Sequence, residues 1–363
     1  MAINKRKEDF LVSQSRRQTA KKRKLSFGFQ QYKLILALLF LCSCQIIKAA
    51  KPKPLYFNNS GTFKIVQFTD THIGLKKLYS EVTIETMRVV LDAEKPDFVI
   101  FTGDIVPDPP IQEGYDKLIE PLVTRHIPYI MVFGNHDSEE VRTKINRVNL
   151  GKLVTKLPGF YQQPPVKDIK GVTNYVLEIK NSKTKKTGTI LYCLDSNDYD
   201  TIAGKRGYAG FSLDQVDWYR KISRKYTNKN NGQPIPALAF FHIPLIEYAS
   251  IKDTSHLYVG LYNEKPCPSQ INTGMFAAML QSGDIMSCFV GHDHDNDYIF
   301  NYFGIALGYG RFTGSKNIYT HLKNNGARVI VLEDGKRAFT TWVREKTGSE
   351  LNVIHYPEQL PFR

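Results

Sequence analysis

Strongly polar residues follow five separate apolar runs of this 363-residue chain. They are Asp70 and His72, Asp104, Asn135 and His136, His242, and His292 and His294. Imidazole and carboxylate groups are the ligands that borderline divalent metals such as zinc, manganese and iron prefer, and no cysteine stands at these positions. The seven residues other than His136 are too many for one tetrahedral ion. They divide between two ions if one carboxylate bridges, so the sequence predicts a dinuclear metal site.

The charge of such a site predicts its substrate. Two divalent ions bring about +4 against about −2 from the side chains of Asp70 and Asp104, which leaves about +2 to meet a phosphate dianion. The metals would then supply the anion site themselves. The predicted cofactors are therefore two divalent ions, with manganese, iron and zinc as candidates, and the predicted partner is a small phosphoester substrate.

The apolar runs before these residues have the length of strands, and helical patterns lie between several of them. In the first half the predicted strands are 63–68, 97–101 and 129–133, and the predicted helices are 82–93, 115–123 and 139–148. This alternation indicates βαβ units and a parallel sheet, with ligands at the carboxyl ends of its strands. The second half adds predicted strands at 174–179, 189–194, 237–241 and 286–290, and helices at 212–224 and 274–281. Strands at 305–308, 327–332 and 338–343 are expected to be antiparallel and to complete a second sheet.

Five short motifs along the chain support a family resemblance. Asp-x-His at 70–72, Gly-Asp at 103–104, Gly-Asn-His-Asp at 134–137, His242 and Gly-His-Asp-His at 291–294 occur in this order. In order and approximate spacing they resemble the five blocks of the calcineurin-like metallophosphoesterase superfamily, over most of residues 63–300. Residues 236–244 and 291–297 look most like its purple-acid-phosphatase-like subgroup, found in fungi, plants and bacterial envelopes. The resemblance implies an α/β fold in which a two-sheet β-sandwich with βαβ units is flanked by helices.

The resemblance also implies a role for each polar residue. A first metal would be held by Asp70, His72, Asp104 and His294, and a second by Asp104, Asn135, His242 and His292. Asp104 would bridge the two ions. His136 would protonate the leaving oxygen or stabilise the transferring phosphoryl group, with Asp137 orienting it. The nucleophile would be a metal-bridging water made hydroxide-like by the ions.

Two positions depart from the family pattern. The superfamily usually places a second acidic or amide residue three positions after the bridging Asp, where this chain has Pro107, with Asp108 one step late. True purple acid phosphatases place a tyrosine ligand there and lack the histidine of the first block. Pro107 and His72 therefore argue against an iron-tyrosinate centre, and a colourless dinuclear site is expected.

Two glycine-bracketed loops are candidates for substrate contacts. Residues 204–208 contribute Arg206 and Tyr208, and residues 308–314 contribute Arg311. In one interpretation these basic and aromatic loops reach over the metal site and contact the phosphate or its leaving group. In the other they are turns whose charged side chains are solvated. Asp195, at the end of a predicted strand, is a candidate to support the site from behind.

The net charge of +14 is concentrated near the N-terminus. Residues 1–33 hold ten Lys or Arg against two acids, a charge of +8, which leaves 14 − 8 = +6 for the other 330 residues. The body therefore lacks the basic face that long nucleic acids require, so no such partner is expected. Residues 34–47 are too short and too mixed for a comfortable membrane span but suit the apolar core of an export signal.

The leader leaves several destinations open. Residues 41–44 resemble a bacterial lipobox, which would attach lipid at Cys44 in the cell envelope or periplasm. The alternatives are secretion after cleavage near Ala49 or Ala50, an uncleaved signal anchor, and a disfavoured nuclear-localisation signal at 21–24. Membrane contact is expected only through this leader.

Three segments are predicted: a leader at 1–50, a phosphoesterase domain at 62–345 and a tail at 346–363. The three cysteines of the body are expected to be buried free thiols. The predicted function is hydrolysis of phosphomonoesters or phosphodiesters at two metals. The alternatives are a nuclease or cyclic-nucleotide phosphodiesterase, and a non-catalytic metal-stabilised envelope binding protein. The oligomeric state is left open.

Overall fold

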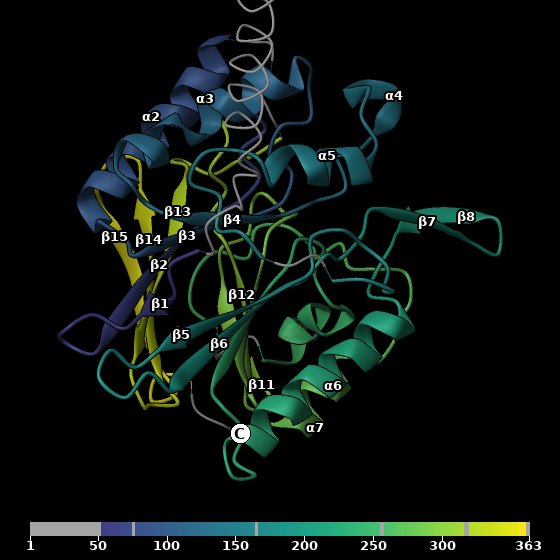
Figure 1. Cartoon of the computed structure of the whole chain (residues 1–363). Coiled ribbons are helices and arrows are strands. Elements are labelled where there is room, and N and C mark those ends of the chain that lie inside the picture. Colours follow the sequence, from purple (N-terminus) through teal and green to yellow (C-terminus); the bar gives the residue numbers. More distant parts are fainter. Residues whose placement is uncertain (1–51, 75–76, 164–165, 255–257, 316–318, 361–363) are drawn as a thin grey trace, which may run out of the picture. The chain divides into compact units, whose positions relative to one another are not determined.

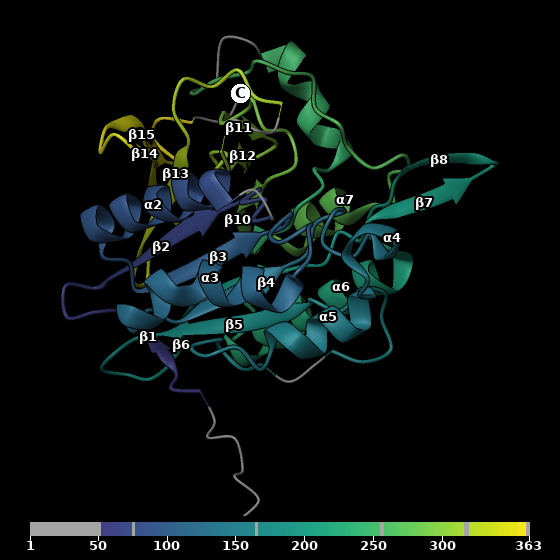
Figure 2. The ribbon, with the colours of Figure 1, turned by 90° about the horizontal axis from the view of Figure 1, so that it is seen from above.

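Two β-sheets facing each other form the frame of the fold (Figure 1). The computed structural model describes residues 52–360, apart from 75–76, 164–165, 255–257 and 316–318. One sheet has seven strands in the order β1-β5-β6-β9-β10-β12-β11, and the other has six in the order β15-β14-β13-β2-β3-β4. A separate two-stranded hairpin, β7-β8, extends away from both sheets in the two views (Figure 1, Figure 2).

The elements have the following bounds. The seven-stranded sheet contains β1 Leu55–Tyr56, β5 Tyr175–Lys180, β6 Thr187–Cys193, β9 Ala237–Phe240, β10 Ile285–Val290, β11 Ile299–Tyr302 and β12 Ile305–Tyr309. The six-stranded sheet contains β2 Thr62–Phe68, β3 Phe98–Thr102, β4 Tyr129–Val132, β13 Gly326–Glu333, β14 Phe339–Glu345 and β15 Glu350–Tyr356. The hairpin is β7 Tyr199–Ile202 and β8 Lys205–Tyr208. The helices are α2 Lys77–Glu94, α3 Ile111–Thr124, α4 Glu140–Thr143, α5 Arg147–Val154, α6 Leu213–Lys229, the 3₁₀ helix η1 Ile246–Thr254 and α7 Met275–Ser282.

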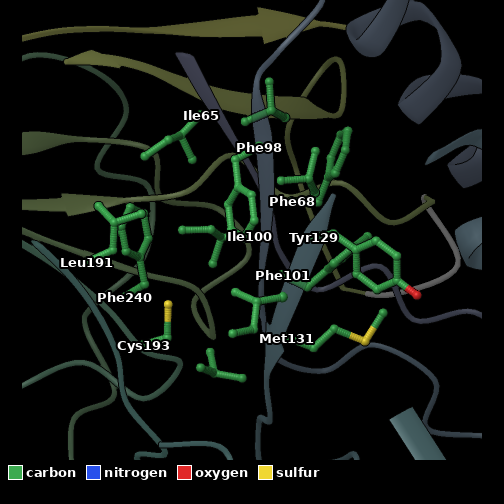
Figure 3. Packing of buried hydrophobic residues seen from close by; sticks show 14 of the residues in the cluster. Ile65, Phe68, Phe98, Ile100, Phe101, Tyr129, Met131, Leu191, Cys193 and Phe240 are labelled. Atoms are coloured by element: carbon green, nitrogen blue, oxygen red, sulfur yellow. The ribbon is translucent and has the colours of Figure 1, made fainter. Parts of the chain in front are cut away.

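The space between the sheets is filled by apolar side chains from both. Ile65 and Ile100 of the six-stranded sheet point toward Leu191 and Phe240 of the seven-stranded sheet (Figure 3). Phe101 points to the opposite side of its sheet in the same view. Both faces of β3 are thus buried, which explains why its sequence is a continuous apolar run rather than an alternating one.

Helices cover the outer faces of the two sheets. Helices α2 and α3 pack on each other, and α2 packs on β2, β13 and β14 (Figure 2). Helices α6 and α7 cover the seven-stranded sheet, where α7 packs on β10. Strands β2, β3 and β4 are parallel and joined by α2 and α3, as the alternating pattern predicts. The predicted fold class, a helix-flanked two-sheet sandwich with βαβ units, is confirmed.

The predicted composition of the second sheet is wrong. Strand β12 is not antiparallel to the C-terminal strands but pairs in parallel with β10 in the other sheet. Strands β13 and β14 are antiparallel to each other, and β13 joins β2. Every residue of β12 is buried, because this strand lies between β10 and β11. A wholly apolar strand suits such an interior position, and its sequence does not reveal which sheet it enters.

The folded unit extends beyond the predicted bounds of 62–345. Strand β15 lies in the segment predicted as a tail and pairs with β14 at the edge of its sheet. Strand β1 precedes residue 62 and pairs with β5. Both are edge strands whose side chains are largely outside the core, so their sequences carry only a weak apolar signal.

The single helix predicted at 139–148 is two short helices. Lys144 has a left-handed backbone with φ of +60°, which ends α4. Asn146 then begins α5, because its side chain accepts a hydrogen bond from the backbone N–H of Asn149. The resulting turn brings Arg147 toward the end of β4, where it contacts the carbonyl oxygens of Phe133 and Gly134.

The cysteine prediction holds for two residues of three. Cys193 and Cys288 are buried free thiols, and Cys267 is a free thiol but exposed. Within the residues searched, no helix is long and apolar enough to cross a membrane. The predictions for the leader at 1–50, including the export signal and Cys44, lie outside the described residues.

Candidate metal centre

The predicted ligands meet at the carboxyl ends of five strands, β2, β3, β4, β9 and β10. Sharp turns immediately after the strands direct these side chains to one place. Asp70, His72, Asp104 and His292 all have positive φ values, of 52°, 43°, 50° and 79°. Left-handed backbone at a non-glycine residue is strained, and such residues cluster at functional sites. Gly134 is needed for the same convergence, because a Cβ atom there would lie 2.2 Å from Asp104 Oδ1.

Six of the seven predicted ligands form two compact groups. Asp70, His72 and His294 make the first group, and Asp104, His242 and His292 make the second. Within each group the potential ligand atoms lie within 4.8 Å of one another. In the first group, Asp70 Oδ1 is 3.4 Å from His294 Nε2.

Asp104 faces both groups. Its Oδ2 atom is 3.3 Å from His242 Nε2 in its own group and 3.9 Å from His72 Nε2 in the other. This is the placement that a bridging carboxylate needs. Asn135, the seventh predicted ligand, has its Oδ1 atom 3.1 Å from His242 Nε2 and therefore belongs beside the second group.

The polar atoms of the site fit a pair of cations. His72 Nε2 and His294 Nδ1 are buried and have no hydrogen-bond partner among the described residues. A buried polar atom without a partner costs about 1 to 3 kcal/mol, a cost that a bound cation removes. The Nδ1 atom of His242 lies 2.8 Å from the carbonyl oxygen of Thr102, which leaves Nε2 free for a metal. The histidine, carboxylate and amide donors are those of borderline divalent ions.

Burial and charge set the protonation of the histidines. Burial lowers the pKa of His72 to about 3, and it lowers the pKa of His292 to about 3 as well, with the neighbouring His242 adding to the effect. Both rings are therefore neutral near pH 7, the form in which imidazole binds a metal. Burial would also lower the pKa of His242, but attraction to Asp104 outweighs it and raises this pKa to about 9. His242 would therefore lose a proton when a metal binds.

The two carboxylates respond in the opposite sense. Burial alone would raise the pKa of Asp70, but the contact with His294 outweighs it and lowers the pKa. The attraction of His242 likewise overcomes burial at Asp104 and holds its pKa well below the usual range. Both groups are thus ionised at neutral pH, as metal ligands must be.

Asp137 orients two loops rather than the ring of His136, contrary to what the resemblance implied. Its carboxylate accepts hydrogen bonds from the backbone N–H groups of Asp104 at 2.9 Å, Ile105 at 2.7 Å and Gly134 at 2.7 Å. These bonds tie the turn after β3 to the turn after β4. Burial and the negative charge of Asp104 raise the pKa of Asp137 to about 6.

His136 stands at the edge of the two groups. Its side chain is 34% exposed, and its Nε2 atom lies 4.0 Å from Asp104 Oδ2. Its backbone N–H donates to Asp104 Oδ1 at 2.8 Å, which fixes the main chain beside the bridging carboxylate. Its Nδ1 atom lies 3.0 Å from Glu139 Oε1. Glu139 was not predicted, although a carboxylate three residues after His136 is a signal that the sequence contains.

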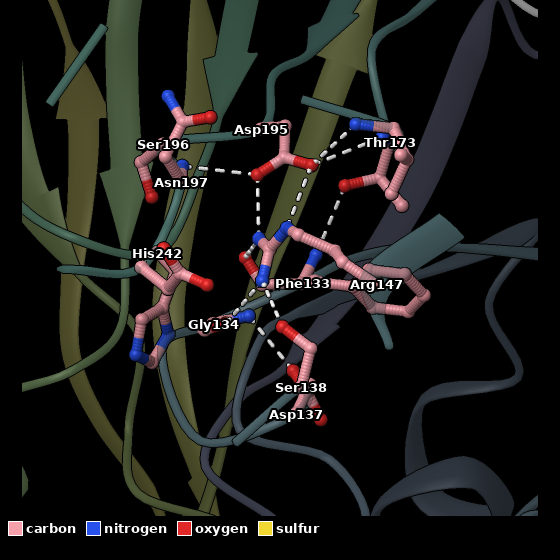
Figure 4. A network of polar contacts seen from close by, with 12 residues as sticks. Phe133, Gly134, Asp137, Ser138, Arg147, Thr173, Asp195, Ser196, Asn197 and His242 are labelled. Carbon is pink, nitrogen blue, oxygen red and sulfur yellow. Dashed lines mark hydrogen bonds and ion pairs between the residues drawn. The ribbon is translucent and has the colours of Figure 1, made fainter. Parts of the chain in front are cut away.

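A buried ion pair supports the turn after β4 from behind (Figure 4). Asp195, predicted as a supporting residue, lies 2.5 Å from Arg147 Nη2. Arg147 in turn donates to the carbonyl oxygens of Gly134 at 2.9 Å and Phe133 at 3.2 Å. Burial would raise the pKa of Asp195, but Arg147 outweighs it and the pKa is lowered. Arg147 was not predicted, because nothing in its local sequence marks an arginine that folds back onto a strand end.

Tyrosines flank the centre on two sides. The ring of Tyr208 meets the ring of His292 edge-on, with 4.3 Å between centroids, and stacks on Tyr199 across the β7-β8 hairpin. The guanidinium of Arg206 lies over Tyr199, 4.0 Å from the ring centroid. Tyr319, which was not predicted, stacks on His294 at 4.5 Å. Tyr208 thus lies against the second metal group, whereas Arg206 contacts Tyr199 of the hairpin, and their role as substrate contacts stays a prediction.

Arg311 does not fit its predicted role as a substrate contact. It is 1% exposed, and its guanidinium lies 2.5 Å from Asp297 and 2.9 Å from Glu345. An arginine saturated by two buried carboxylates holds the loops together and has no donor directed at a substrate. Asp108, one step later than the family pattern, pairs with Arg142 at 2.6 Å.

Comparison with known proteins agrees with this geometry. The family described as calcineurin-like phosphoesterase matches residues 63–296. The chain is 31% identical to "Probable inactive purple acid phosphatase 29" of Arabidopsis thaliana over 353 residues, covering 89% of this chain and 90% of that one. It is 33% identical to "Phosphatase DCR2" of Saccharomyces cerevisiae over 273 residues, covering 66% of this chain but 45% of the yeast protein. A dimetal phosphatase structure from Danio rerio matches with a TM-score of 0.51 and 13% identity, covering 81% of this chain and 98% of that chain, a similarity of fold.

Proposed function

Because the chain belongs to the calcineurin-like phosphoesterase family, we propose that it hydrolyses phosphate esters at a centre of two divalent metal ions. The observation that carries the proposal is the pair of His and Asp groups with Asp104 facing both. When bound, the two cations supply Lewis acidity that activates water and offsets the charge of a phosphoryl group. The ions that fit the donor set are manganese, iron and zinc.

The chain's own residues supply the remaining chemistry. His136 is the proton donor in this proposal, because its Nε2 atom faces Asp104 and therefore faces an ester held between the two groups. Its half-exposed ring has access to solvent, from which it regains the proton after each turnover. Asp137 and Arg147 hold the turns after β3 and β4, so that the ligands keep their spacing.

The substrate in this proposal is a small phosphoester. Tyr208 and Tyr319 stand beside the second and first metal groups, where they border the leaving group of an ester. Arg206 on the β7-β8 hairpin, whose guanidinium lies over Tyr199, is the cation proposed to contact the phosphate or its leaving group. The charge outside residues 1–33, +6 over 330 residues, gives no support to a long nucleic-acid substrate.

Activity is the step that needs the direct test, since the names of the relatives include both a phosphatase and probable inactive phosphatases. The purified full chain is assayed with nitrophenyl phosphate and bis-nitrophenyl phosphate in manganese and in zinc. Asp104→Asn is expected to lose metal and turnover together, and His136→Ala to keep metal and lose turnover. Metal binding without turnover of either ester would favour the non-catalytic binding protein. Turnover of the diester alone would favour a phosphodiesterase.

Export is a separate proposal that rests on the leader. The apolar residues 34–47 and the basic run before them are proposed to direct the chain out of the cytoplasm, with lipid at Cys44 as the form of attachment. A Cys44→Ser variant that leaves the membrane fraction would support the lipid anchor. An unchanged distribution would refute it.

A further inference from the structure

A continuous series of polar contacts joins the predicted metal ligand Asn135 to the proposed proton donor His136 through Tyr199 and Glu139. The side-chain amide of Asn135 donates to Tyr199 Oη at 2.9 Å. The hydroxyl of Tyr199 donates to Glu139 Oε1 at 3.1 Å. The same oxygen of Glu139 lies 3.0 Å from His136 Nδ1, an ion-pair distance at which the two atoms do not form a hydrogen bond. This series of contacts therefore begins at a metal ligand, Asn135, and ends at the proton donor, His136.

The residues that make this series of contacts come from separate parts of the fold. Glu139 directly precedes helix α4, and Tyr199 begins strand β7 of the hairpin, 60 positions further along. The second carboxylate oxygen of Glu139 lies 3.8 Å from Arg142, which is itself paired with Asp108 at 2.6 Å. Glu139 is therefore held from two sides, with only a quarter of its side chain exposed.

We propose that Glu139, held by Tyr199, is the positioning residue that fixes the ring of His136 for proton donation. This inference rests on the proposed phosphoesterase function. The negative charge of Glu139 attracts the Nδ1 edge of the His136 ring and so keeps Nε2 turned toward Asp104 and the ester. The side chain of His136 is 34% exposed, and its Nδ1 atom makes no hydrogen bond to any described residue that would hold the ring in place of this contact. As the oxygen of water bonds to phosphorus, the ester P–O bond breaks, its electron pair stays on the leaving oxygen, and that oxygen takes the proton from Nε2.

Tyr199 has a second effect in the same network. Because its hydroxyl oxygen accepts from the Asn135 amide nitrogen, the amide oxygen of Asn135 is directed toward His242 and the second metal group. A tyrosine at this position therefore orients a metal ligand and the carboxylate behind the proton donor at once. Through Tyr199, the β7-β8 hairpin contributes a residue to the proposed active site.

The test compares matched substitutions of neighbouring or equivalent residues. Glu139→Gln is compared with Glu140→Gln, the same change at the adjacent exposed residue. Tyr199→Phe keeps the ring under Arg206 and against Tyr208, and is compared with Tyr226→Phe, which removes a tyrosine-glutamate hydrogen bond of 2.9 Å on helix α6. Turnover is measured with a nitrophenyl ester, whose leaving group needs no proton, and with an alkyl ester, whose leaving group does. Metal content is measured in each preparation.

The expected signature is selective. Glu139→Gln should lower kcat for the alkyl ester by at least about tenfold, part of the hundredfold or more that a general acid supplies, and leave the nitrophenyl ester within about threefold. Tyr199→Phe should lower the ratio of kcat for the alkyl ester to kcat for the nitrophenyl ester by a smaller factor than Glu139→Gln does. The controls Glu140→Gln and Tyr226→Phe should leave this ratio unchanged. The metal content of Glu139→Gln should match that of the wild type. Equal losses on both esters, or a loss of metal, would overturn the positioning role.

A second readout does not depend on turnover. The ring nitrogen signals of His136, assigned by their loss in His136→Asn, are recorded by ¹⁵N NMR at one fixed pH. Glu139→Gln should shift the Nδ1 signal, and Glu140→Gln should not. An unchanged signal overturns the inference even if the wild type hydrolyses esters. A shifted signal in a protein that hydrolyses no ester supports the contact and refutes the proposed function instead.

Discussion

Replacement of Arg147 by methionine is expected to cost about 3 to 5 kcal/mol of the free energy of unfolding. The substitution keeps most of the aliphatic stem but removes the charge that faces Asp195 at 2.5 Å. The carboxylate of Asp195 is fully buried, so it cannot recover hydration when its partner is lost. The carbonyl oxygens of Phe133 and Gly134 also lose their donor.

Two terms set this magnitude. Breaking a buried ion pair from one side is strongly destabilising, because it leaves a buried charge unpaired. The hydrogen bonds that Asp195 accepts from the backbone of Val172 and Thr173 remain and limit the loss. The matched control is Arg125→Met, which breaks an exposed pair with Asp92 and should cost no more than about 1 kcal/mol.

The assay is urea unfolding followed by circular dichroism, with metal removed by a chelator, because ions that bind only the folded state would add to the apparent stability. Turnover of nitrophenyl phosphate is then measured with metal restored. Because Arg147 holds the turn that carries Asn135 and His136, turnover should fall by more than tenfold, about 1.4 kcal/mol in the barrier. A cost in stability below about 1 kcal/mol, no larger than that of Arg125→Met, would refute the assigned role of the pair.

Four further predictions concern single residues. Asp195→Asn should be less stable than the wild type at pH 7. Because the folded pKa of Asp195 is lowered, its contribution to stability is present above the unfolded pKa of about 3.9 and is lost as pH falls through the lower folded pKa. A difference in unfolding free energy between variant and wild type that is the same at pH 7 and at pH 3 would contradict this prediction. Arg311→Met should lower stability by about 3 to 5 kcal/mol without raising KM, whereas a raised KM in a stable variant would restore the substrate-contact role. Gly134→Ala should reduce the number of metal ions bound per chain, because the new Cβ would lie 2.2 Å from Asp104 Oδ1. Elemental analysis measures this number, and full metal content would contradict the prediction by showing that the turn can shift to accept the Cβ. Tyr208→Ala should raise KM for a nitrophenyl ester severalfold, and an unchanged KM would remove Tyr208 from the substrate contacts.

The ligand set is the part of the site that the sequence predicts well. Metal chemistry restricts the residue types to His, Asp and Asn, and the fold places them directly after apolar strands, so each ligand has a local signal. The structure brings Asp70, His72, Asp104, His242 and the pair 292 and 294 into the two groups that the motifs imply.

The residues that support the ligands have no such local signal. Arg147, Tyr199 and Tyr319 reach the site only because a helix start, a hairpin and a loop fold back over the strand ends. Arg311 shows the converse, since a glycine-bracketed arginine resembles a substrate contact until its buried partners Asp297 and Glu345 are known. Long-range packing decides these roles.

The sheets show the same division between local and long-range information. Strands β2, β3 and β4 alternate with helices in the sequence, so their parallel order follows from the pattern. The sheet that β12 enters and the pairing of β13 with β2 depend on contacts between distant segments. The edge strand β15 is too polar to be recognised by its own sequence.

The most direct test of the account is a titration of the metal-free full chain with manganese, with bound metal and ester hydrolysis measured at each addition. A dinuclear centre bridged by Asp104 predicts two ions bound per chain, with hydrolysis rising as the second ion binds. Hydrolysis that is complete after one ion, or two bound ions with no hydrolysis of monoester or diester, would contradict the proposed dimetal phosphoesterase.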